Sequence, residues 1–255
     1  MLKPRIIPCL LIDEYGDMVK TIKFDYSNRR YIGDVENAVK IFNEKKIDEL
    51  IVLDISATLN KREPNYNLIK KIASSCRMPF SYGGGIKNID QVKNIIKLGV
   101  EKIILNTVTF ENKNLIKEVA QLFGSQSIAV CFDVTFKDNQ IQFFSNSGTK
   151  YENNIEDPLN FIKEIQSYNP GELIINSIDR DGTMTGYELN CIKKIFPITK
   201  VPLTILGGAG KIEHLKDVIN TIPLSGLSSG SLFIYKSRLK AILINYPNKS
   251  DIFNS

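Results

Sequence analysis

The chain repeats itself internally, and this repeat limits the possible folds more than any other feature of the sequence. Val201–Leu215 carries the turn Gly207-Gly208-Ala209-Gly210 between an apolar run and an amphipathic run, and Met78–Val92 has the same shape around Gly83-Gly84-Gly85. Glu172 lies 123 positions after Glu49 (172 − 49), and Cys131 lies 122 positions after Cys9 (131 − 9). The sequence therefore predicts two equivalent halves, about 1–124 and 125–255, each with four strand-like runs.

Short apolar runs and amphipathic runs alternate through both halves. The apolar runs predict strands at Ile6–Leu11, Leu50–Asp54, Phe80–Tyr82, Lys102–Leu105, Ile128–Phe132, Leu173–Asn176, Leu203–Leu206 and Gly226–Ser229. The runs of helical period predict helices at Asp34–Asn43, Tyr66–Ser75, Asp90–Leu98, Asn114–Phe123, Asp157–Tyr168, Leu189–Ile195, Ile212–Asn220 and Ser237–Leu243. Eight strands, each followed by a helix, predict an α/β fold of the (β/α)8 TIM-barrel type, built as one domain over 1–255 from two duplicated half-barrels. A doubly wound open sheet is the alternative.

One segment falls outside this alternation. Phe136–Lys150 follows the fifth predicted strand and is rich in Asn, Ser and Gly. It predicts a hairpin-like excursion, which forms either a lid over the barrel mouth or a surface insertion.

Composition and charge exclude several classes of protein. The formal charge of +5 is mild, and Lys and Arg mostly alternate with Asp and Glu, so no nucleic-acid partner is expected. The four cysteines have no CxxC spacing and fit reduced core thiols, and we expect no metal and no cofactor. No 18-residue apolar run and no signal-peptide pattern is present, which predicts a soluble cytoplasmic protein that does not contact a membrane.

The two glycine turns suggest where a ligand binds. In a barrel of this type reactive residues lie at the C-terminal ends of the strands, and a glycine turn before a helix offers free backbone N–H groups to an anion. A single glycine turn is equally consistent with a role only in permitting positive φ angles. Two such turns on opposite sides of one mouth favour a ligand with a phosphate at each end.

Four motifs are specific enough to compare with known families, namely Arg5-Ile-Ile-Pro-Cys-Leu, Gly83-Gly-Gly-Ile, Ser177-Ile-Asp-Arg-Asp-Gly-Thr183 and Gly207-Gly-Ala-Gly-Lys211. Together they resemble the HisF family, the cyclase subunit of imidazole glycerol phosphate synthase, and the resemblance extends over nearly the whole chain. It implies a lyase-type synthase subunit of histidine biosynthesis. Such a subunit takes ammonia from a separate HisH-like glutaminase, passes it through the barrel and uses it on a phosphorylated substrate at the C-terminal face.

The resemblance also implies roles for individual residues. The substrate and its phosphates are assigned to Asp54, Gly85, Asn106, Thr107, Asp181, Gly182, Gly207, Gly208, Gly230 and Ser231. A polar gate for ammonia at the opposite end of the barrel is assigned to Arg5, Glu49, Lys102 and Glu172. Two cations and two carboxylates at strand starts also fit a structural interpretation, in which buried salt bridges close the barrel floor.

The chain departs from the family at one of two proton-transfer positions. Asp133 fills the position on the fifth strand, where nearby phosphates would raise its pKa by like-charge repulsion and make it a general acid. The repeat places Leu11 at the equivalent position on the first strand, and leucine cannot transfer a proton. Asp13 could replace it only through a two-residue bulge, and otherwise the missing base would cost roughly 10²–10⁴-fold in rate. Asn176 and Leu206 also stand where the family more usually has a hydroxyl residue.

This departure suggests a second function. Segments such as Pro8-Cys-Leu-Leu-Ile12 are similar to HisF-like paralogues of bacterial surface-polysaccharide clusters, which are thought to supply ammonia for converting an acetamido sugar to an acetamidino sugar. A catalytically silent conduit that delivers ammonia to a third protein is the corresponding non-enzymatic hypothesis. His214, the single histidine, is expected to be exposed or to pack at a helix start.

Overall fold

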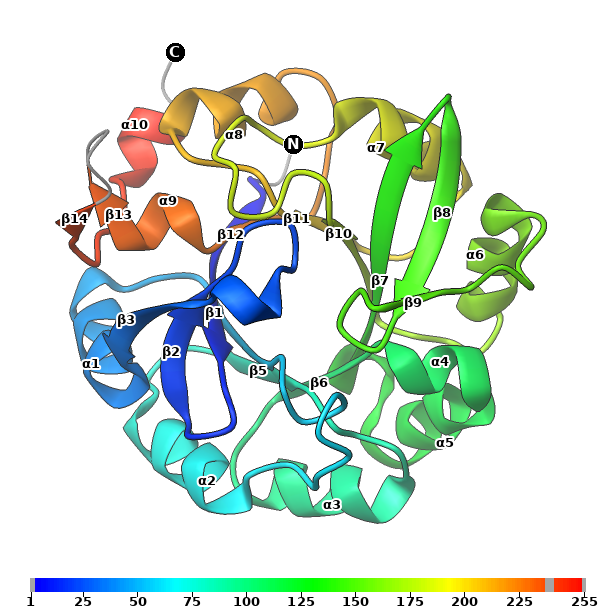
Figure 1. Cartoon of the computed structure of the whole chain (residues 1–255), viewed down its shortest axis with the longest axis horizontal. Helices are drawn as coiled ribbons and strands as arrows, with labels where there is room; N and C mark the ends of the chain where they lie inside the picture. The colour runs from blue at the N-terminus through cyan, green and yellow to red at the C-terminus, as the bar shows by residue number, and fades with distance from the viewer. Residues whose placement is uncertain (1–2, 237–240, 254–255) are drawn as a thin grey trace.

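The computed structural model describes residues 3–236 and 241–253, and its centre is a closed parallel barrel (Figure 1). Hydrogen bonds join neighbouring strands in the order β10, β11, β12, β1, β4, β5, β6, β7, and β7 pairs with β10 to close the ring. These strands are β1 (Arg5–Ile12), β4 (Leu50–Asp54), β5 (Phe80–Gly83), β6 (Lys102–Leu105), β7 (Ile128–Lys137), β10 (Glu172–Ser177), β11 (Leu203–Leu206) and β12 (Gly226–Ser229). The closure confirms the predicted TIM barrel and rules out the open sheet.

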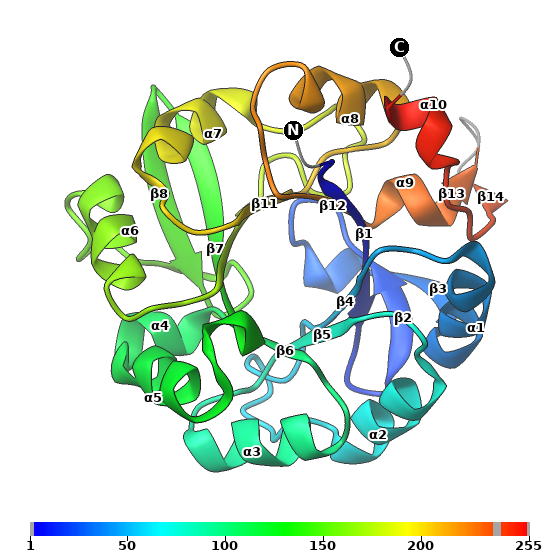
Figure 2. The same ribbon diagram turned by 180° about the vertical axis from the view of Figure 1, so that it is seen from behind.

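Helices surround the barrel, as the views from its two ends show (Figures 1 and 2). They are α1 (Val35–Lys45), α2 (Tyr66–Ser75), α3 (Ile89–Lys97), α5 (Asn114–Phe123), α6 (Pro158–Gln166), α7 (Leu189–Ile195) and α8 (Ile212–Ile219). Each buries its apolar stripe on the outer face of the strands. Asn88 begins α3 with a capping box, in which its side chain and that of Gln91 accept backbone N–H groups reciprocally. None of the helices in the described ranges is long and apolar enough to cross a membrane.

The strand register repeats between the two halves. Leu11 pairs with Leu53 between β1 and β4, and Asp133 pairs with Asn176 between β7 and β10. All four pairs between β4 and β5 recur between β10 and β11 at an offset of 123 residues, beginning with Leu50–Phe80 and Leu173–Leu203. At the last strand the offset becomes 124 (226 − 102), because Ser81 pairs with Lys102 while Thr204 pairs with Gly226. The repeat is therefore one residue longer at β12, and the structural equivalent of Asn106 is Gly230.

Two antiparallel extensions lie at the C-terminal end of the barrel, one after β1 and one after β7. β2 (Asp17–Lys20) and β3 (Arg30–Asp34) form a ribbon beside β1, with the short helix η1 (Tyr26–Asn28) between them. β7 continues past the barrel and pairs with β8 (Gln140–Ser145), which pairs with β9 (Lys150–Tyr151). The predicted hairpin-like excursion is therefore confirmed as a hairpin, packed on a cluster of Phe110, Phe132, Phe143 and Phe161.

The eighth predicted helix is wrong in its described part. Residues 237–240 of the predicted Ser237–Leu243 lie outside the described residues, and β14 (Ala241–Ile242) pairs antiparallel with β13 (Tyr235–Lys236). Two short helices take its place, α9 (Ser231–Ile234) directly after β12 and α10 (Lys249–Phe253) near the end of the chain. The remaining short elements are α4 (Thr107–Glu111), η2 (Ser125–Ser127) and η3 (Phe196–Ile198).

Candidate functional site

A closed ring of alternating charges lies at the end of the barrel where the strands begin. Arg5 pairs with Glu49 and, at 2.6 Å, with Glu172. Lys102 Nζ lies 2.9 Å from Glu49 and 2.7 Å from Glu172. Both carboxylates are buried, and burial opposes their charge, but Lys102 and Arg5 together lower the pKa of Glu172. The four residues predicted as a gate thus form one ion-pair network across the barrel floor.

The ring is reinforced by two hydroxyl groups that obey the internal repeat. Ser81 Oγ donates to Glu49 at 2.6 Å, and Thr204 Oγ1 donates to Glu172 at 2.5 Å. Ser81 and Thr204 are themselves 123 residues apart (204 − 81). Each carboxylate therefore contacts Arg5, Lys102 and one hydroxyl group.

Above the ring the barrel interior is apolar. Alternate residues of the strands point inward, and they form a cluster separate from the core beneath the helices. Its members include Ile7, Cys9, Ile51, Ile104, Ala129, Cys131 and Ile174. Burial raises the pKa of the Cys9 thiol to about 12, so this thiol stays protonated and unreactive at neutral pH.

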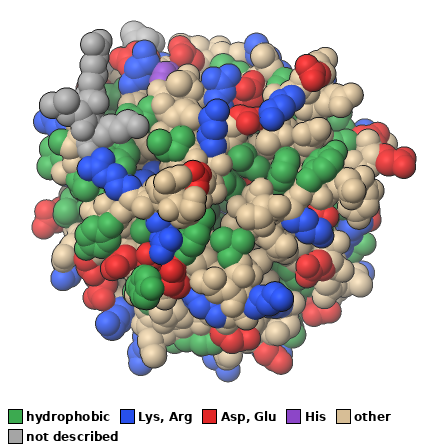
Figure 3. Space-filling view, in the orientation of Figure 1, with side chains coloured by type: hydrophobic (Ala, Val, Ile, Leu, Met, Phe, Trp, Pro, Cys, Tyr) green, Lys and Arg blue, Asp and Glu red, His purple; other side chains and the backbone are tan. Residues whose placement is uncertain are grey.

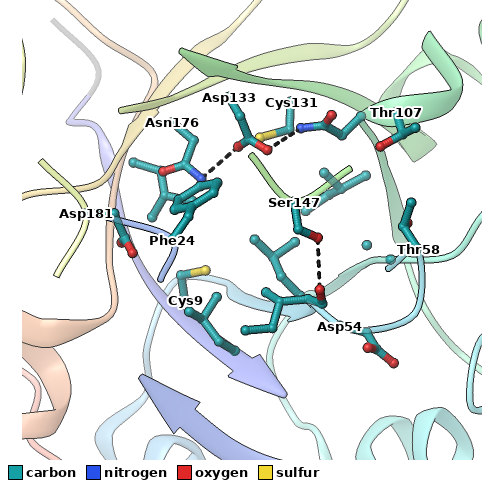
Figure 4. Close-up of a pocket in the computed structure, with 18 of the residues that line it drawn as sticks. Cys9, Phe24, Asp54, Thr58, Thr107, Cys131, Asp133, Ser147, Asn176 and Asp181 are labelled. Carbon is teal, nitrogen blue, oxygen red and sulfur yellow. Dashed lines mark hydrogen bonds between the residues drawn. The ribbon is translucent and has the colours of Figure 1, made fainter. Parts of the chain in front are cut away.

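A cavity opens above this apolar section, at the C-terminal mouth, and encloses about 990 Å³ including its solvent-filled opening. Seven of the predicted site residues line it, namely Asp54, Gly85, Asn106, Thr107, Asp133, Asp181 and Gly230. Asp133 and Asn176 lie on one side and Asp54 on the other (Figure 4). Gly182, Gly207, Gly208 and Ser231 lie outside this lining.

Asp133 is the carboxyl group in the cavity that is best placed to transfer a proton. It is 6% exposed, and its two carboxylate oxygens accept one amide N–H each, from Asn106 at 2.8 Å and from Asn176 at 3.0 Å. Burial raises its pKa to about 7; the two amides oppose this shift, and the nearby Asp181 adds a smaller rise. The raised pKa predicted from the sequence is present, but burial is its main cause in the ligand-free chain, ahead of like-charge repulsion.

Leu11 faces the same cavity with no polar substitute beside it on β1. The pairing of Cys9, Leu11 and Ile12 with β4 is regular, so β1 contains no bulge there. Asp13 accepts the backbone N–H groups of Tyr15 and Asp17 in the turn that follows β1, and it does not line the cavity. The structure therefore contradicts the alternative in which Asp13 acts as the base.

The first glycine turn lines the cavity as expected. Gly84 and Gly85 have positive φ angles of 126° and 71°, and a Cβ on Gly84 would collide with the Asp54 backbone. The Thr107 hydroxyl accepts the Asn146 N–H at 3.0 Å, so the loop after β8 already reaches this site. Asp54 has a different role, because both of its oxygens accept from Arg62 at 2.6 Å and it holds the loop after β4 in place.

The second glycine turn is covered. Gly208 packs against the Gly186 backbone, and Gly182 packs against the Thr21 carbonyl. The Lys23 N–H also donates to the Asp181 carbonyl at 2.9 Å, which holds the loop after β2 over this side of the mouth. The repeat alone had suggested that the two turns contribute equally to the cavity. In the structure only the first turn lines it.

Lys20 is a site residue that the sequence reasoning missed. It is 5% exposed, lines the cavity, and places its ammonium against Gly230 on the side of the second glycine turn. Burial raises the pKa of the neighbouring Asp181, while Lys20 and Thr21 oppose that rise. β2 pairs with β1 as β8 pairs with β7, which places Ser145 at the position of Lys20 in the other half. The repeat therefore offers no second cation that could have pointed to Lys20.

The loop after β8 also supplies a residue that was not predicted. Ser147 lines the cavity, and its hydroxyl donates to the Ile55 carbonyl at 2.8 Å (Figure 4). Phe24 lines the cavity from the loop after β2, and Gly148 packs against its ring. Of the two interpretations of the excursion, a cover over the mouth fits these contacts and a remote insertion does not.

The remaining surface features are less specific. His214 at the start of α8 accepts the Gly210 N–H through Nδ1 at 3.2 Å, which fits the expected packing at a helix start. Over the face around the mouth, Lys and Arg side chains are interspersed with Asp and Glu (Figure 3).

Comparison with known proteins assigns this barrel to a family. The family model described as histidine biosynthesis protein matches residues 5–240. The chain belongs to this family. The family resemblance drawn from the sequence motifs is thereby confirmed.

Individual relatives match over nearly their whole length. A protein of Leptospira borgpetersenii, provisionally named imidazole glycerol phosphate synthase subunit HisF, is 50% identical over 98% of both chains. A Vibrio vulnificus protein, provisionally named as another such HisF subunit, is 46% identical over 98% of this chain and 95% of its own. The HisF subunit of Exiguobacterium sibiricum is 38% identical over 85% of each chain. The chain is thus a HisF-like member of the histidine biosynthesis family.

Proposed function

We propose that this chain is the synthase subunit of a two-component glutamine amidotransferase. In this proposal a HisH-like glutaminase docks at the charged end of the barrel, and its ammonia crosses the interior to a phosphorylated small molecule at the mouth. The observation that carries the proposal is the continuous sequence of environments along the barrel axis: the ion-pair ring, the apolar section and the cavity around Asp133.

The apolar section suits ammonia and excludes ions. Moving an isolated ammonium ion past Ile7, Ile51 and Ile174 would cost many kcal/mol in desolvation, whereas ammonia is neutral. The ring can admit a neutral molecule if Lys102 moves aside while Arg5 keeps both carboxylates paired. The competing interpretation, a static salt-bridge floor, predicts no passage at all.

The mouth supports binding more strongly than it supports the usual family reaction. The first glycine turn, Thr107 and the Lys20 ammonium offer donors to phosphate groups. Asp133 can supply a proton near neutral pH. Leu11 removes the second acid–base group, and Leu206 and Leu53 make its surroundings apolar.

Leu11 is also the observation that favours a second candidate. In that alternative the chain belongs to the paralogues of surface-polysaccharide clusters and provides ammonia for converting an acetamido group to an acetamidino group, either at its own mouth or as a silent conduit to a third protein. The barrel, ring and apolar section would then be retained, while the histidine-pathway cyclisation is lost.

The two candidates can be separated with the purified chain, an ammonium salt and the histidine-pathway substrate. We expect no measurable imidazole product from the unmodified chain, and we expect Leu11→Asp to restore turnover by roughly 10²-fold or more over that background. Leu11→Asn is the matched control, because it has the same size and polarity but cannot exchange a proton.

Three outcomes decide the matter. Product from the unmodified chain would show that the usual cyclisation survives and would remove the reason for the alternative. Recovery in Leu11→Asn as well would show that polarity, rather than a carboxylate, was missing. If neither variant turns over and no bisphosphorylated sugar raises the melting temperature, the phosphorylated substrate is the wrong ligand class.

A further inference from the structure

Asp133 is held from both sides by amides on neighbouring strands. Asn106 follows β6, Asp133 lies on β7 and Asn176 lies on β10, and these three strands are adjacent in the barrel. Each carboxylate oxygen receives one N–H, at 2.8 Å from Asn106 and at 3.0 Å from Asn176. Two donors from opposite sides fix both the position and the plane of the carboxylate.

The two amide side chains donate to Asp133 while their own carbonyl oxygens have no hydrogen-bond donor in the described part of the chain. Among the described residues, Asn106 Oδ1 and Asn176 Oδ1 are both buried without a hydrogen-bond partner. Buried acceptors are normally paired, so this orientation indicates that donation to the carboxylate decides how the two side chains are turned. An amide rotated by half a turn would present its oxygen instead, and could accept the proton of a protonated Asp133.

The equivalent row in the other half of the barrel cannot transfer protons. The registers place Leu11 opposite Leu53 where Asp133 stands opposite Asn176. Of these two matching rows, only the row of Asp133 therefore has a carboxyl group that can both take up and return a proton.

We propose that Asn176, together with Asn106, is a positioning residue that allows Asp133 to act alone as both proton acceptor and proton donor. The inference rests on the proposed function only for the identity of the ligand. The reaction class it suits is addition of ammonia to an electrophilic carbon with departure of an oxygen group. Asp133 takes one proton from the attacking nitrogen and gives the same proton to the leaving oxygen, so the carboxylate is regenerated and no other reactant is needed.

The other titratable groups around Asp133 define what a pH experiment must separate. Asp181 faces it across the cavity with Lys20 beside it, and the Cys9 and Cys131 thiols lie beneath it. Neither thiol is ionised near neutral pH, because burial raises the pKa of each. Burial also raises the pKa of Asp181, so the titration of Asp133 must be followed through its own assigned signal.

The test is a ¹³C NMR titration of the aspartate carboxyl groups in the full, ligand-free chain, with the Asp133 signal assigned through Asp133→Asn. We expect Asn176→Leu and Asn106→Leu each to raise the Asp133 midpoint by about one to two pH units, because each removes one hydrogen bond to the charged form. Asn176→Thr is the conservative variant, since it retains one donor, and it should keep the midpoint within about half a unit of the unmodified chain.

A purely structural role predicts a different result. In that case Asn176→Leu lowers the melting temperature but leaves the midpoint in place, and the proposal is overturned. It is also overturned if Asn176→Thr shifts the midpoint as far as Asn176→Leu does. If Asn176→Leu does not fold, Asn106→Leu and Asn176→Thr still decide the question. Because no ammonia-dependent activity is measured, failure of the proposed function would leave this result unchanged, and the converse holds too.

Discussion

A single carboxylate dominates the chemistry of this mouth at the scale of residues. Asp133 is buried, which disfavours its ionised form, but both of its oxygens accept hydrogen bonds, which favour that form. Its pKa of about 7 follows from this balance, with burial as the larger effect. A group with such a pKa exchanges protons readily at neutral pH, which a freely solvated aspartate does not.

The raised pKa of Asp133 makes its contribution to stability depend on pH. Its folded pKa of about 7 exceeds the ordinary 3.8, so the stabilisation it provides is complete below 3.8 and is lost as pH rises to about 7. We expect the free energy of unfolding of Asp133→Asn, measured relative to that of the unmodified chain, to increase by about 2–3 kcal/mol as the pH rises from 5 to 8. Denaturant unfolding at both pH values measures this, with the exposed Asp90→Asn as a control that should show no such gain.

If the difference in free energy of unfolding between Asp133→Asn and the unmodified chain did not change with pH, this account of the site would be contradicted. It would mean that Asp133 stays ionised throughout the range, as an exposed aspartate does.

Individual residues differ in how far the sequence reveals them. The family resemblance located Asp133, and the internal repeat, which is visible in the sequence, then located Leu11 at the equivalent position. Lys20 could not, because it enters the cavity from a short ribbon that the sequence pattern does not predict, and its counterpart in the other half is Ser145. The contacts of Asn106 and Asn176 with Asp133 depend on side-chain directions across three strands, which spacing along the chain does not encode.

At the scale of elements, the loop 146–149 links separate parts of the mouth. Ser147 donates to the Ile55 carbonyl, Asn146 donates to Thr107, and Gly148 packs against Phe24. Asn146, Ser147 and Gly148 all have positive φ angles, of 49°, 53° and 80°. The loop thus reaches the ends of β4 and β6 and the loop after β2 through few contacts, in a conformation that only some residues adopt easily.

We predict that Gly148→Ala loosens this loop while leaving the barrel intact. A Cβ there would lie 2.6 Å from Phe24 Cδ2, in addition to the cost of a positive φ angle. Gly99→Ala is the matched control, because its φ angle is 101° but its Cβ would make an ordinary 3.5 Å contact with Ala73. Hydrogen exchange should accelerate at 146–151 only in Gly148→Ala, and equal acceleration in the control would show that the Phe24 contact does not hold the loop.

The elements themselves were predictable where tertiary packing agrees with local pattern. Seven of the eight predicted helices and all eight barrel strands match observed elements, because each helix buries one apolar face and each strand is a short run buried on both faces. The eighth failed at 241–243, where the short apolar run Ala241-Ile-Leu-Ile244 reads equally well as helix or strand. The ribbon of β2 and β3 was not foreseen, since Asp17–Lys20 is too short to give a pattern.

At the scale of the whole molecule, the charged ring joins the two halves of the barrel. Arg5, Glu49 and Lys102 belong to the first half and Glu172 to the second. The carboxylates and their hydroxyl partners follow the repeat, but both cations come from the first half, so only the cations depart from the symmetry. The sequence predicted the four residues through family resemblance; their closure into one ring needed the barrel.

Glu49 and Glu172 allow a matched experiment, since each contacts both cations and one hydroxyl group. Replacing Glu172 by Gln leaves Arg5 and Lys102 sharing one carboxylate. We expect this to lower the free energy of unfolding by about 3 kcal/mol at pH 7. This value is near the lower limit for a buried ion pair, because the Arg5 side chain is about a third exposed. The folded pKa of Glu172 is lowered, so its stabilisation is present above the ordinary 4.5 and is lost as pH falls through the folded value. The difference in free energy of unfolding between Glu172→Gln and the unmodified chain should therefore shrink in denaturant unfolding at pH 3.

Glu49→Gln breaks only contacts within the first half, so it is the matched control for the link between the halves. A broadened, two-step unfolding curve in Glu172→Gln but not in Glu49→Gln would identify the ring as that link. Identical single-step curves would mean that the strand pairing of β1 with β12 and of β6 with β7 suffices to hold them together.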